Sequence, residues 1–470
     1  LYVKSPAWMR KSLSGPLSLL PIEFVYGATY RQYRSAIARS ESEPEFVRDF
    51  QLCSLRQIIR DCIEKSEFYR ERFRETFGGL PDVEDFSLAD LERLPVLTRD
   101  EVRYEVERLL VVHPSQADVV STSGSSGTPL RFYLDKDRSV KEWAFITHIW
   151  GRIGYHPYHR RAVLRGVFIP NVDSRPWEYD AALRELRLSP FHLTPEIMDK
   201  YLQLIQKYRI HFIHGYPSAI TILASHALRT GWRPPEHLLG ILPISESLFP
   251  YQRALMQQAF GQVAIMPFYG LSEKVAIAGE VPGAPDLYEF EPLYGITELV
   301  NDLGQPIKTA GIRGRIISTG LLSRAMPLIR YDTGDMGTLV QAPSSENCFR
   351  LRVRNIHSRW NQEFLVSNKG ALISIAAINI HSPVYACIKE FQFYQDTPGL
   401  AVVRVVPMPG YRYEDIQPFL KEIQEKVGRG LVLRLELVEA LPMNPRGKRS
   451  FIEQRLDIQH YGGAVIEVGA

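Results

Sequence analysis

The sequence predicts an α/β protein with a large N-terminal domain, built on parallel sheets flanked by helices, and a small C-terminal α+β domain. Three observations support this prediction. A chain of 470 residues is longer than one typical domain. From about residue 190, short apolar segments alternate with amphipathic segments of helical length. After about residue 360, two apolar strands flank a single helix, so we predict domains at residues 1–359 and 360–470.

The predicted elements follow in order along the chain. Residues 45–110 carry apolar side chains at helical spacing and are expected to be mostly helical. From residue 194 onward, strands alternating with helices favour right-handed crossovers and a parallel sheet that is covered on both faces. The strands expected there are 210–213, 238–245 and 263–268, and the helices are 195–208, 215–228 and 250–260. In the small domain we expect strands at 400–408 and 431–441 and a helix at 414–427.

Composition and charge exclude several classes of function. The 56 basic and 53 acidic residues are mixed along the chain, the formal net charge is only +3, and no basic block indicates a nucleic-acid surface. No apolar run reaches the 18 residues expected of a membrane-spanning helix. Pro16, Pro21 and Glu23 break the apolar run at residues 16–25, which therefore does not fit a signal peptide. We expect a cytoplasmic protein whose partners are small molecules.

The four cysteines, Cys53, Cys62, Cys348 and Cys387, are far apart in the sequence and lack the spacing of zinc ligands. We expect them to be buried free thiols, which fits a reducing compartment. We infer no structural zinc.

The stretch STSGSSGTPL, residues 121–130, lies between two predicted strands. It lacks the lysine and the following helix of a Walker-type phosphate loop, so that interpretation fails. Its glycines still allow successive backbone N–H groups to point inward, and its hydroxyl groups add further donors for a phosphate. Taken alone, the loop is either a phosphate cradle or a flexible hairpin tip.

Three further motifs favour the phosphate cradle. FYGLSE covers residues 268–273, RYDTGD covers 330–335 and NPRGKRSF covers 444–451. With the loop at 121–130, they resemble the phosphate loop, YGxTE, YxTGD and C-terminal GK of the adenylate-forming acyl-ligase superfamily, in the same order. Within this superfamily the chain is most similar to the phenylacetate–CoA ligase branch, which includes ligases of surface-polysaccharide and amide-forming pathways. The resemblance spans roughly residues 45–455.

The resemblance implies a two-step reaction. A carboxylate attacks the α-phosphate of ATP to give an acyl-adenylate and pyrophosphate, and a thiol such as CoA, or an amine, then takes the acyl group. Because two anions meet in the first step, cations and hydrogen-bond donors are needed at the α-phosphate. The small domain is implied to be a mobile lid that carries the catalytic Lys448 to the reacting oxygens.

The resemblance also implies roles for individual residues. Glu273 matches the catalytic acid that holds Mg²⁺, a hard cation that prefers oxygen ligands. Asp335 matches the carboxylate that accepts hydrogen bonds from the ribose hydroxyls. Ser272 stands at the family's threonine position facing the phosphate, and Tyr269 matches the aromatic ring that packs on adenine. The other nucleotide-binding candidates are Ser123, Ser125, Ser126, Gly127, Thr128, Ser245, Glu246, Gly270 and Arg359.

Some of these residues have a second interpretation. Glu273 and Asp335 would also fit a helix cap or a turn, and Lys448 a solvated basic patch. Tyr216 is expected to border the acyl pocket or to belong to the core. Lys274 is expected to pair with a polar or anionic group of the acid, or to be a surface lysine.

The segment between the two domains departs from the family pattern. Relatives carry Gly-Arg followed by an acidic pair, whereas this chain has Ser358-Arg359 and a single acid, Glu363. The pivot is therefore expected at Gln362 or Glu363.

Three functions are consistent with the motifs: an acyl-adenylate-forming ligase, a non-catalytic AMP-binding protein, and an adenylyl transferase that stops at an adenylylated product. The presence of Glu273, Asp335 and Lys448 together favours the ligase. No residue separates CoA from an amine as the acceptor.

Overall fold

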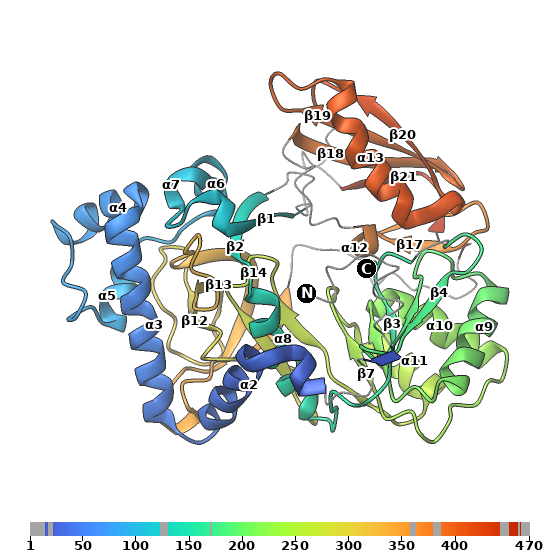
Figure 1. Cartoon of the computed structure of the whole chain (residues 1–470), viewed down its shortest axis with the longest axis horizontal. Coiled ribbons are helices and arrows are strands. Elements are labelled where there is room, and N and C mark those ends of the chain that lie inside the picture. The colour runs from blue at the N-terminus through green and yellow to red at the C-terminus, as the bar shows by residue number, and fades with distance from the viewer. Residues whose placement is uncertain are drawn as a thin grey trace.

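In the computed structural model, the chain forms several sheets with helices packed around them and a small C-terminal unit, so the predicted fold class is confirmed (Figure 1). The structure describes residues 15–16, 22–122, 130–169, 172–357, 363–378, 387–441, 451–458 and 461. The phosphate-loop candidates Ser123, Ser125, Ser126, Gly127 and Thr128, together with Arg359 and Lys448, lie outside these ranges.

The predicted helical region forms a series of helices that begin and end at recognisable caps. Ser66 starts one helix by accepting a hydrogen bond from the Tyr69 backbone N–H at 3.3 Å, and Gly78 ends it with φ +78°. The prediction of a mostly helical region is confirmed. Its helices are α3 (Pro44–Lys65), α4 (Glu67–Phe77), α5 (Leu88–Arg93), α6 (Arg99–Tyr104) and α7 (Val106–Leu109), preceded by α2 (Ile22–Ser40) and followed by the short 3-10 helix η2 (Pro114–Gln116).

A two-stranded antiparallel hairpin follows, formed by β1 (Ala117–Thr122) and β2 (Leu130–Asp135). The two strands expected on either side of the Ser/Gly stretch are therefore confirmed, while residues 123–129 lie outside the described residues. Thr122 and Leu130 are paired across the hairpin, which fixes the two ends of the intervening segment next to each other. The long helix α8 (Arg138–Gly151) comes directly after.

The six-stranded sheet has the order β4-β5-β3-β6-β7-β8 and is parallel except for β4. The central strands are fully buried, as expected of a sheet that is covered on both faces. The predicted strand–helix alternation is thereby confirmed, although β8 spans only two residues. The elements are β3 (Arg161–Leu164), β4 (Trp177–Asp180), β5 (Glu185–Leu188), α9 (Pro195–Lys207), β6 (Phe212–Gly215), α10 (Pro217–Arg229), β7 (Gly240–Pro243), α11 (Pro250–Phe260) and β8 (Ala264–Ile265).

A seven-stranded antiparallel sheet, which the sequence did not predict, completes the large domain. Its order is β12-β13-β14-β15-β11-β10-β9. The Tyr269 hydroxyl on β9 nevertheless donates to Asp335 on β14 at 2.8 Å. Strands so far apart in the order touch only if the sheet curls strongly. Its elements are β9 (Phe268–Gly270), β10 (Ile277–Val281), β11 (Ala284–Phe290), β12 (Gly295–Val300), β13 (Arg313–Gly320), β14 (Tyr331–Gln341), η3 (Ser345–Asn347) and β15 (Arg352–His357).

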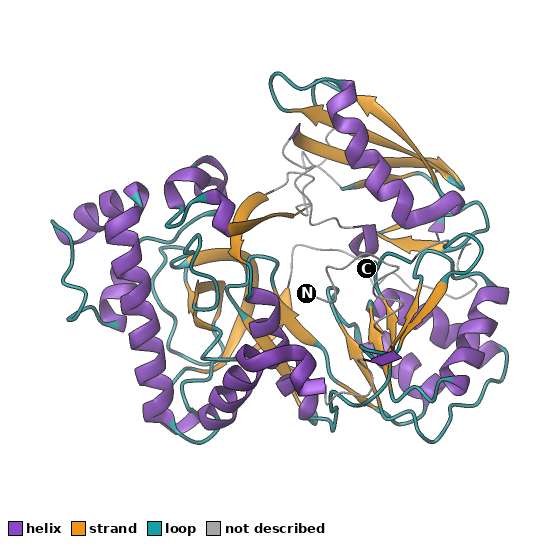
Figure 2. Cartoon of the chain, viewed as in Figure 1, coloured by secondary structure: helices purple, strands orange, loops and turns teal. Residues whose placement is uncertain are grey.

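The C-terminal unit is an α+β structure, as predicted. Its four-stranded sheet has the order β20-β19-β18-β21, and α13 lies across one face (Figure 2). The helix buries Ile416, Phe419, Ile423 and Val427, which share one side at helical spacing. Its elements are β16 (Phe364–Val366), β17 (Leu372–Ser374), α12 (Ile375–Ile378), β18 (Ile388–Thr397), β19 (Leu400–Pro407), α13 (Tyr413–Val427), η5 (Gly428–Gly430), β20 (Val432–Leu437) and β21 (Ile452–Gln454).

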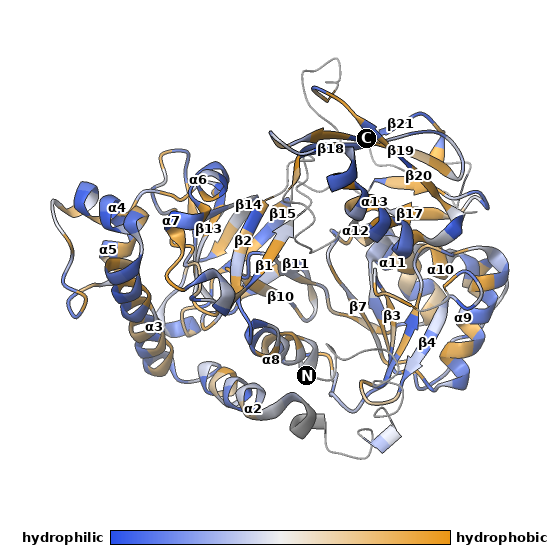
Figure 3. Ribbon diagram, turned by 45° about the horizontal axis from the view of Figure 1, so that its top comes forward, coloured by the Kyte–Doolittle hydropathy of each residue, from blue (hydrophilic) through white to orange (hydrophobic). Residues whose placement is uncertain are grey.

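The C-terminal unit packs on the parallel-sheet unit. Apolar residues of β16, β17 and α12 belong to the same buried cluster as those of β3, β6 and α10. A Cβ on Gly166 would lie 2.3 Å from the carbonyl oxygen of Ala377, so the two backbones touch. Arg429 donates its backbone N–H to Asp173 Oδ1 at 2.8 Å. The polar sides of helices such as α3 and α13 face outward (Figure 3).

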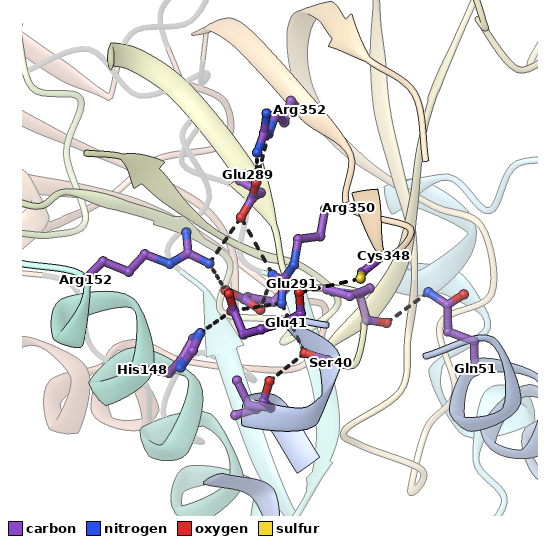
Figure 4. A network of polar contacts seen from close by, with 12 residues as sticks. Ser40, Glu41, Gln51, His148, Arg152, Glu289, Glu291, Cys348, Arg350 and Arg352 are labelled. Carbon is purple, nitrogen blue, oxygen red and sulfur yellow. Dashed lines mark hydrogen bonds and ion pairs between the residues drawn. The ribbon is translucent and has the colours of Figure 1, made fainter. Parts of the chain in front are cut away.

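A network of charged groups, buried at Glu291 and Arg350, joins the N-terminal helices to the antiparallel sheet (Figure 4). Glu291 accepts hydrogen bonds from Arg350 at 2.8 Å and from Arg152 at 2.7 Å. Arg350 also reaches Glu41, whose carboxylate contacts His148 at 2.7 Å. The network therefore links the end of α2 and the end of α8 to Glu291, which directly follows β11.

Three of the four cysteines are buried free thiols, and burial raises the pKa of the Cys62 thiol. Cys53 is exposed, so the prediction is wrong for this residue. The reason is its place on α3, because the buried positions Gln51, Leu55 and Ile58 define a face that does not include Cys53. In the described part of the chain, no helix is both long enough and apolar enough to span a bilayer.

Candidate functional site

The curled sheet brings two predicted nucleotide-binding residues into direct contact. The Tyr269 hydroxyl donates to Asp335 Oδ2 at 2.8 Å, although the two residues are 66 positions apart. Burial, and then the Asp335 carboxylate, raise the pKa of Tyr269, so its hydroxyl stays protonated and acts as a donor. The Tyr269 ring meets Phe290 edge to face, with centroids 5.6 Å apart.

Glu273 lies in the turn after β9 and is 5% exposed. Its Oε1 accepts from the Tyr331 hydroxyl at 2.9 Å and lies 3.5 Å from Arg99 Nη1. Tyr331 begins β14, the strand that also carries Asp335. The turn after β9 and the strand β14 therefore position Glu273 and Asp335 together.

A magnesium ion fits this acid on chemical grounds. Both contacts of Glu273 within the described residues go to Oε1, which leaves Oε2 as a hard oxygen ligand. Mg²⁺ in nucleotide sites is typically held by one or two carboxylates together with substrate phosphates, so a single protein carboxylate is sufficient. The described residues contain no group of three or more His, Cys, Asp or Glu side chains arranged around a metal ion.

Arg99 and Tyr331 were missed as site residues by the sequence analysis. Arg99 stands at the start of α6, 174 positions before Glu273, and no local pattern links the two. Tyr331 lies inside RYDTGD, so its place in the motif was the available signal.

Ser272 and Lys274 flank Glu273 and line a separate cavity of about 580 Å³. Lys274 has a left-handed backbone with φ +59°. Its Nζ donates to Glu142 Oε1 on α8 at 2.7 Å. Lys274 is therefore neither a free surface lysine nor a core residue, and its pairing with a group of the acid stays a prediction. Gly270 is exposed at the end of β9.

Glu246 and Ser245 follow β7 at the carboxyl edge of the parallel sheet, where ligands of such sheets bind. The Glu246 carboxylate accepts from the backbone N–H and the hydroxyl of Ser218, each at 2.9 Å. It also accepts from the Ser374 hydroxyl of the C-terminal unit. Burial raises the pKa of Glu246. Ser245 is exposed and has φ +64°, a strained conformation for serine.

Tyr216 is buried at the start of α10. Its hydroxyl oxygen accepts the backbone N–H of Gly166 at 3.2 Å and so supports the segment after β3. This contact gives Tyr216 a role in the core, while its place at the acyl pocket stays a prediction.

The chain resembles several characterised proteins. Residues 365–455 match the family described as the CapK C-terminal domain. The sequence is 23% identical to Protein CapK of Staphylococcus aureus, over 84% of this chain and 90% of CapK. It is 27% identical to phenylacetate-coenzyme A ligase of Aromatoleum evansii, over 65% of this chain and 69% of that ligase. The structure of 2-hydroxyisobutyryl-CoA ligase in complex with 2-HIB-AMP and CoA aligns with a TM-score of 0.54 and 19% identity, covering 90% and 93% of the two chains, so the two share a fold.

Proposed function

Because the chain is a relative of CapK and the phenylacetate–coenzyme A ligases within the adenylate-forming acyl-ligase superfamily, we propose that it is an AMP-forming ligase. It activates a carboxylic acid as its acyl-adenylate, releases pyrophosphate, and passes the acyl group to the thiol of CoA or to an amine. One observation carries the proposal. The curled sheet gathers Tyr269, Asp335 and Glu273, the residues that the sequence motifs assign to nucleotide and metal, at β9 and β14.

In this proposal Asp335 binds the ribose hydroxyls of ATP. Tyr269 packs its ring on the adenine and holds the Asp335 carboxylate in position through its hydroxyl. A carboxylate suits this role because it accepts two hydrogen bonds at once. Glu273 holds Mg²⁺, which neutralises phosphate charge when bound. Arg99 and Tyr331 fix the Glu273 side chain, so the acid is oriented before the nucleotide arrives.

We propose that residues 1–359 and 360–470 act as two domains, with Lys448 carried by the second. Lys448 stabilises the charge that develops between the carboxylate and the α-phosphate. The Ser123–Thr128 stretch supplies phosphate donors, and Arg359 adds a nucleotide contact near the hinge. The contact between Glu246 and Ser374 belongs to one docked orientation of the small domain, and rotation to admit the acceptor breaks it.

The test is a panel of carboxylic acids with Mg-ATP and the full chain. Pyrophosphate and AMP are measured with CoA, with amino acids, and without an acceptor. The proposal predicts acid-dependent pyrophosphate release and AMP release that depends on one acceptor class. A stable adenylylated product would identify an adenylyl transferase, and nucleotide binding without turnover of any acid would identify a non-catalytic protein.

A further inference from the structure

The cavity beside Ser272 and Lys274 is bounded by three parts of the large domain. They are the stem of the β1–β2 hairpin, the first turns of α8, and the turn that follows β9. Its volume of about 580 Å³ is within the range of small-molecule sites. The same hairpin carries the Ser/Gly stretch, and Ser272 is the direct neighbour of Glu273. The cavity therefore borders the segments to which the proposed function assigns the phosphates and the metal.

Two ion pairs make up the polar wall of this cavity. Lys274 Nζ donates to Glu142 Oε1 at 2.7 Å, and their side chains are 23% and 17% exposed. Arg138 Nη1 donates to Asp118 Oδ2 at 2.7 Å, with side chains 16% and 28% exposed. The four formal charges cancel, and each pair keeps some access to solvent. Ser139 and Ser272 add hydroxyl groups.

The lining also contains the apolar residues Ala117, Val119, Val120 and Leu134, but its charged side disfavours a ligand that is apolar throughout. An alkyl or aryl group in the cavity would take water away from four charged side chains and offer no hydrogen bond in return, which is costly. A ligand with hydroxyl, amino or carboxylate groups replaces the lost water. The backbone of Lys274 also has a left-handed conformation, which is strained for lysine. Such a conformation persists only where the surrounding structure holds it in place.

We propose that this cavity binds the distal end of the acid substrate and that the acid is polar there, with a hydroxyl, amino or second carboxyl group. The inference rests on the proposed function, because it places the acid's reacting carboxylate next to the segment of Ser272 and Glu273. Lys274 and Glu142 then determine which charge the distal group of the acid can carry, and Arg138 with Asp118 completes the polar wall.

The test uses four acids of equal length: hexanoate, 6-hydroxyhexanoate, 6-aminohexanoate and adipate. Acid-dependent pyrophosphate release gives kcat/KM for each acid. For the wild-type protein we expect the best polar acid to exceed hexanoate by about 10-fold or more, the equivalent of one good hydrogen bond to a charged group.

Two variants make the test specific for charge. Lys274→Met leaves Glu142 unpaired and should raise the ratio of 6-aminohexanoate to adipate about 5-fold or more. Glu142→Gln leaves Lys274 unpaired and should lower the same ratio by a similar factor. Loss of fold would not shift the two ratios in opposite directions. Lys274→Arg should keep the wild-type ratio. Lys136→Met is the matched control, an exposed lysine close in sequence that does not line the cavity.

A second measurement separates the inference from the proposed function. The same acids are titrated calorimetrically into the full chain with α,β-methylene-ATP present. Pyrophosphate release with unchanged acid ratios in both variants would overturn the cavity inference and leave the ligase standing. Opposite shifts in binding without pyrophosphate release from any acid would support the polar cavity and overturn the ligase. Neither release nor selective binding would overturn both.

Discussion

Replacement of Glu291 by glutamine should measure how much the buried charged network contributes to stability. Glu291 is 2% exposed and contacts two guanidinium groups, those of Arg350 and Arg152. Burial opposes its ionisation, but the two arginines outweigh burial and lower the pKa of Glu291 to about 2, from an ordinary value of 4.5. A difference of about 2.5 pKa units corresponds to roughly 3 kcal/mol of stability for the ionised carboxylate.

The sign follows from the lowered pKa. The contribution is fully present above about pH 4.5 and is lost as the pH falls through about 2. Glu291→Gln should therefore lower the free energy of unfolding by ~3 kcal/mol at pH 7, because the buried Arg350 and the partly buried Arg152 lose their shared partner. At pH 3 the difference between wild type and variant should be less than half as large.

The assay is urea unfolding at pH 7 and pH 3, followed by tryptophan fluorescence, since Trp143 and Trp150 lie on α8, the helix that also carries His148 of the network. Glu67→Gln serves as the control, because this acid is 63% exposed and pairs with Arg108 at the surface. Glu67→Gln should lower the free energy of unfolding by under ~1 kcal/mol. A loss below 1 kcal/mol for Glu291→Gln, or a difference that stays constant with pH, would refute the reasoning.

Three further predictions concern the hinge, the nucleotide and the lid. Burial raises the pKa of Glu363 to about 7, so this acid supports the fold below about pH 4.5 and that support is lost as the pH rises through 7. Glu363→Gln should therefore raise the free energy of unfolding by up to ~3 kcal/mol at pH 8 and change it little at pH 4, and equal effects at both pH values would contradict this. Tyr269→Phe removes the hydroxyl that holds Asp335 and should raise KM for ATP about 5- to 10-fold, with KM for the acid unchanged. An unchanged KM for ATP would count against the assignment of Asp335 to the ribose. Lys448→Ala should slow ATP–pyrophosphate exchange on the order of 10²–10³-fold, while acyl transfer from supplied acyl-adenylate stays within a few-fold of the wild-type rate. Equal losses in both reactions would exclude a role of Lys448 confined to the first step.

Local patterns predicted those elements whose ends are marked by specific residues. The helix expected at 250–260 is observed at Pro250–Phe260, because proline favours the first helical turn and Gly261 ends the helix with φ +84°. The antiparallel sheet was not predicted, because its pairings join segments that are distant in the sequence. Strand β11, for example, pairs with β15, where Leu287 lies opposite Arg354, 67 positions later, and no local signal fixes that register.

The candidate site shows the same limit. Motifs identified Tyr269, Glu273 and Asp335, and the structure brings these three residues to neighbouring places. Their supporting partner Arg99 could not be read from the sequence, and neither could Glu142 beside Lys274, because such contacts depend on the packing of remote helices. The domain division between residues 359 and 360 stays a prediction, and apolar residues of both parts share one buried cluster.

The central claim is that the acid is activated as an acyl-adenylate, and isotope transfer tests it most directly. An acid that supports pyrophosphate release is labelled with ¹⁸O in both carboxylate oxygens and turned over by the full chain with Mg-ATP and acceptor. Because a carboxylate oxygen attacks the α-phosphorus and stays on it when the acyl group leaves, mass spectrometry should find one ¹⁸O atom in each AMP. AMP that contains no ¹⁸O, formed together with acylated acceptor, would contradict the account.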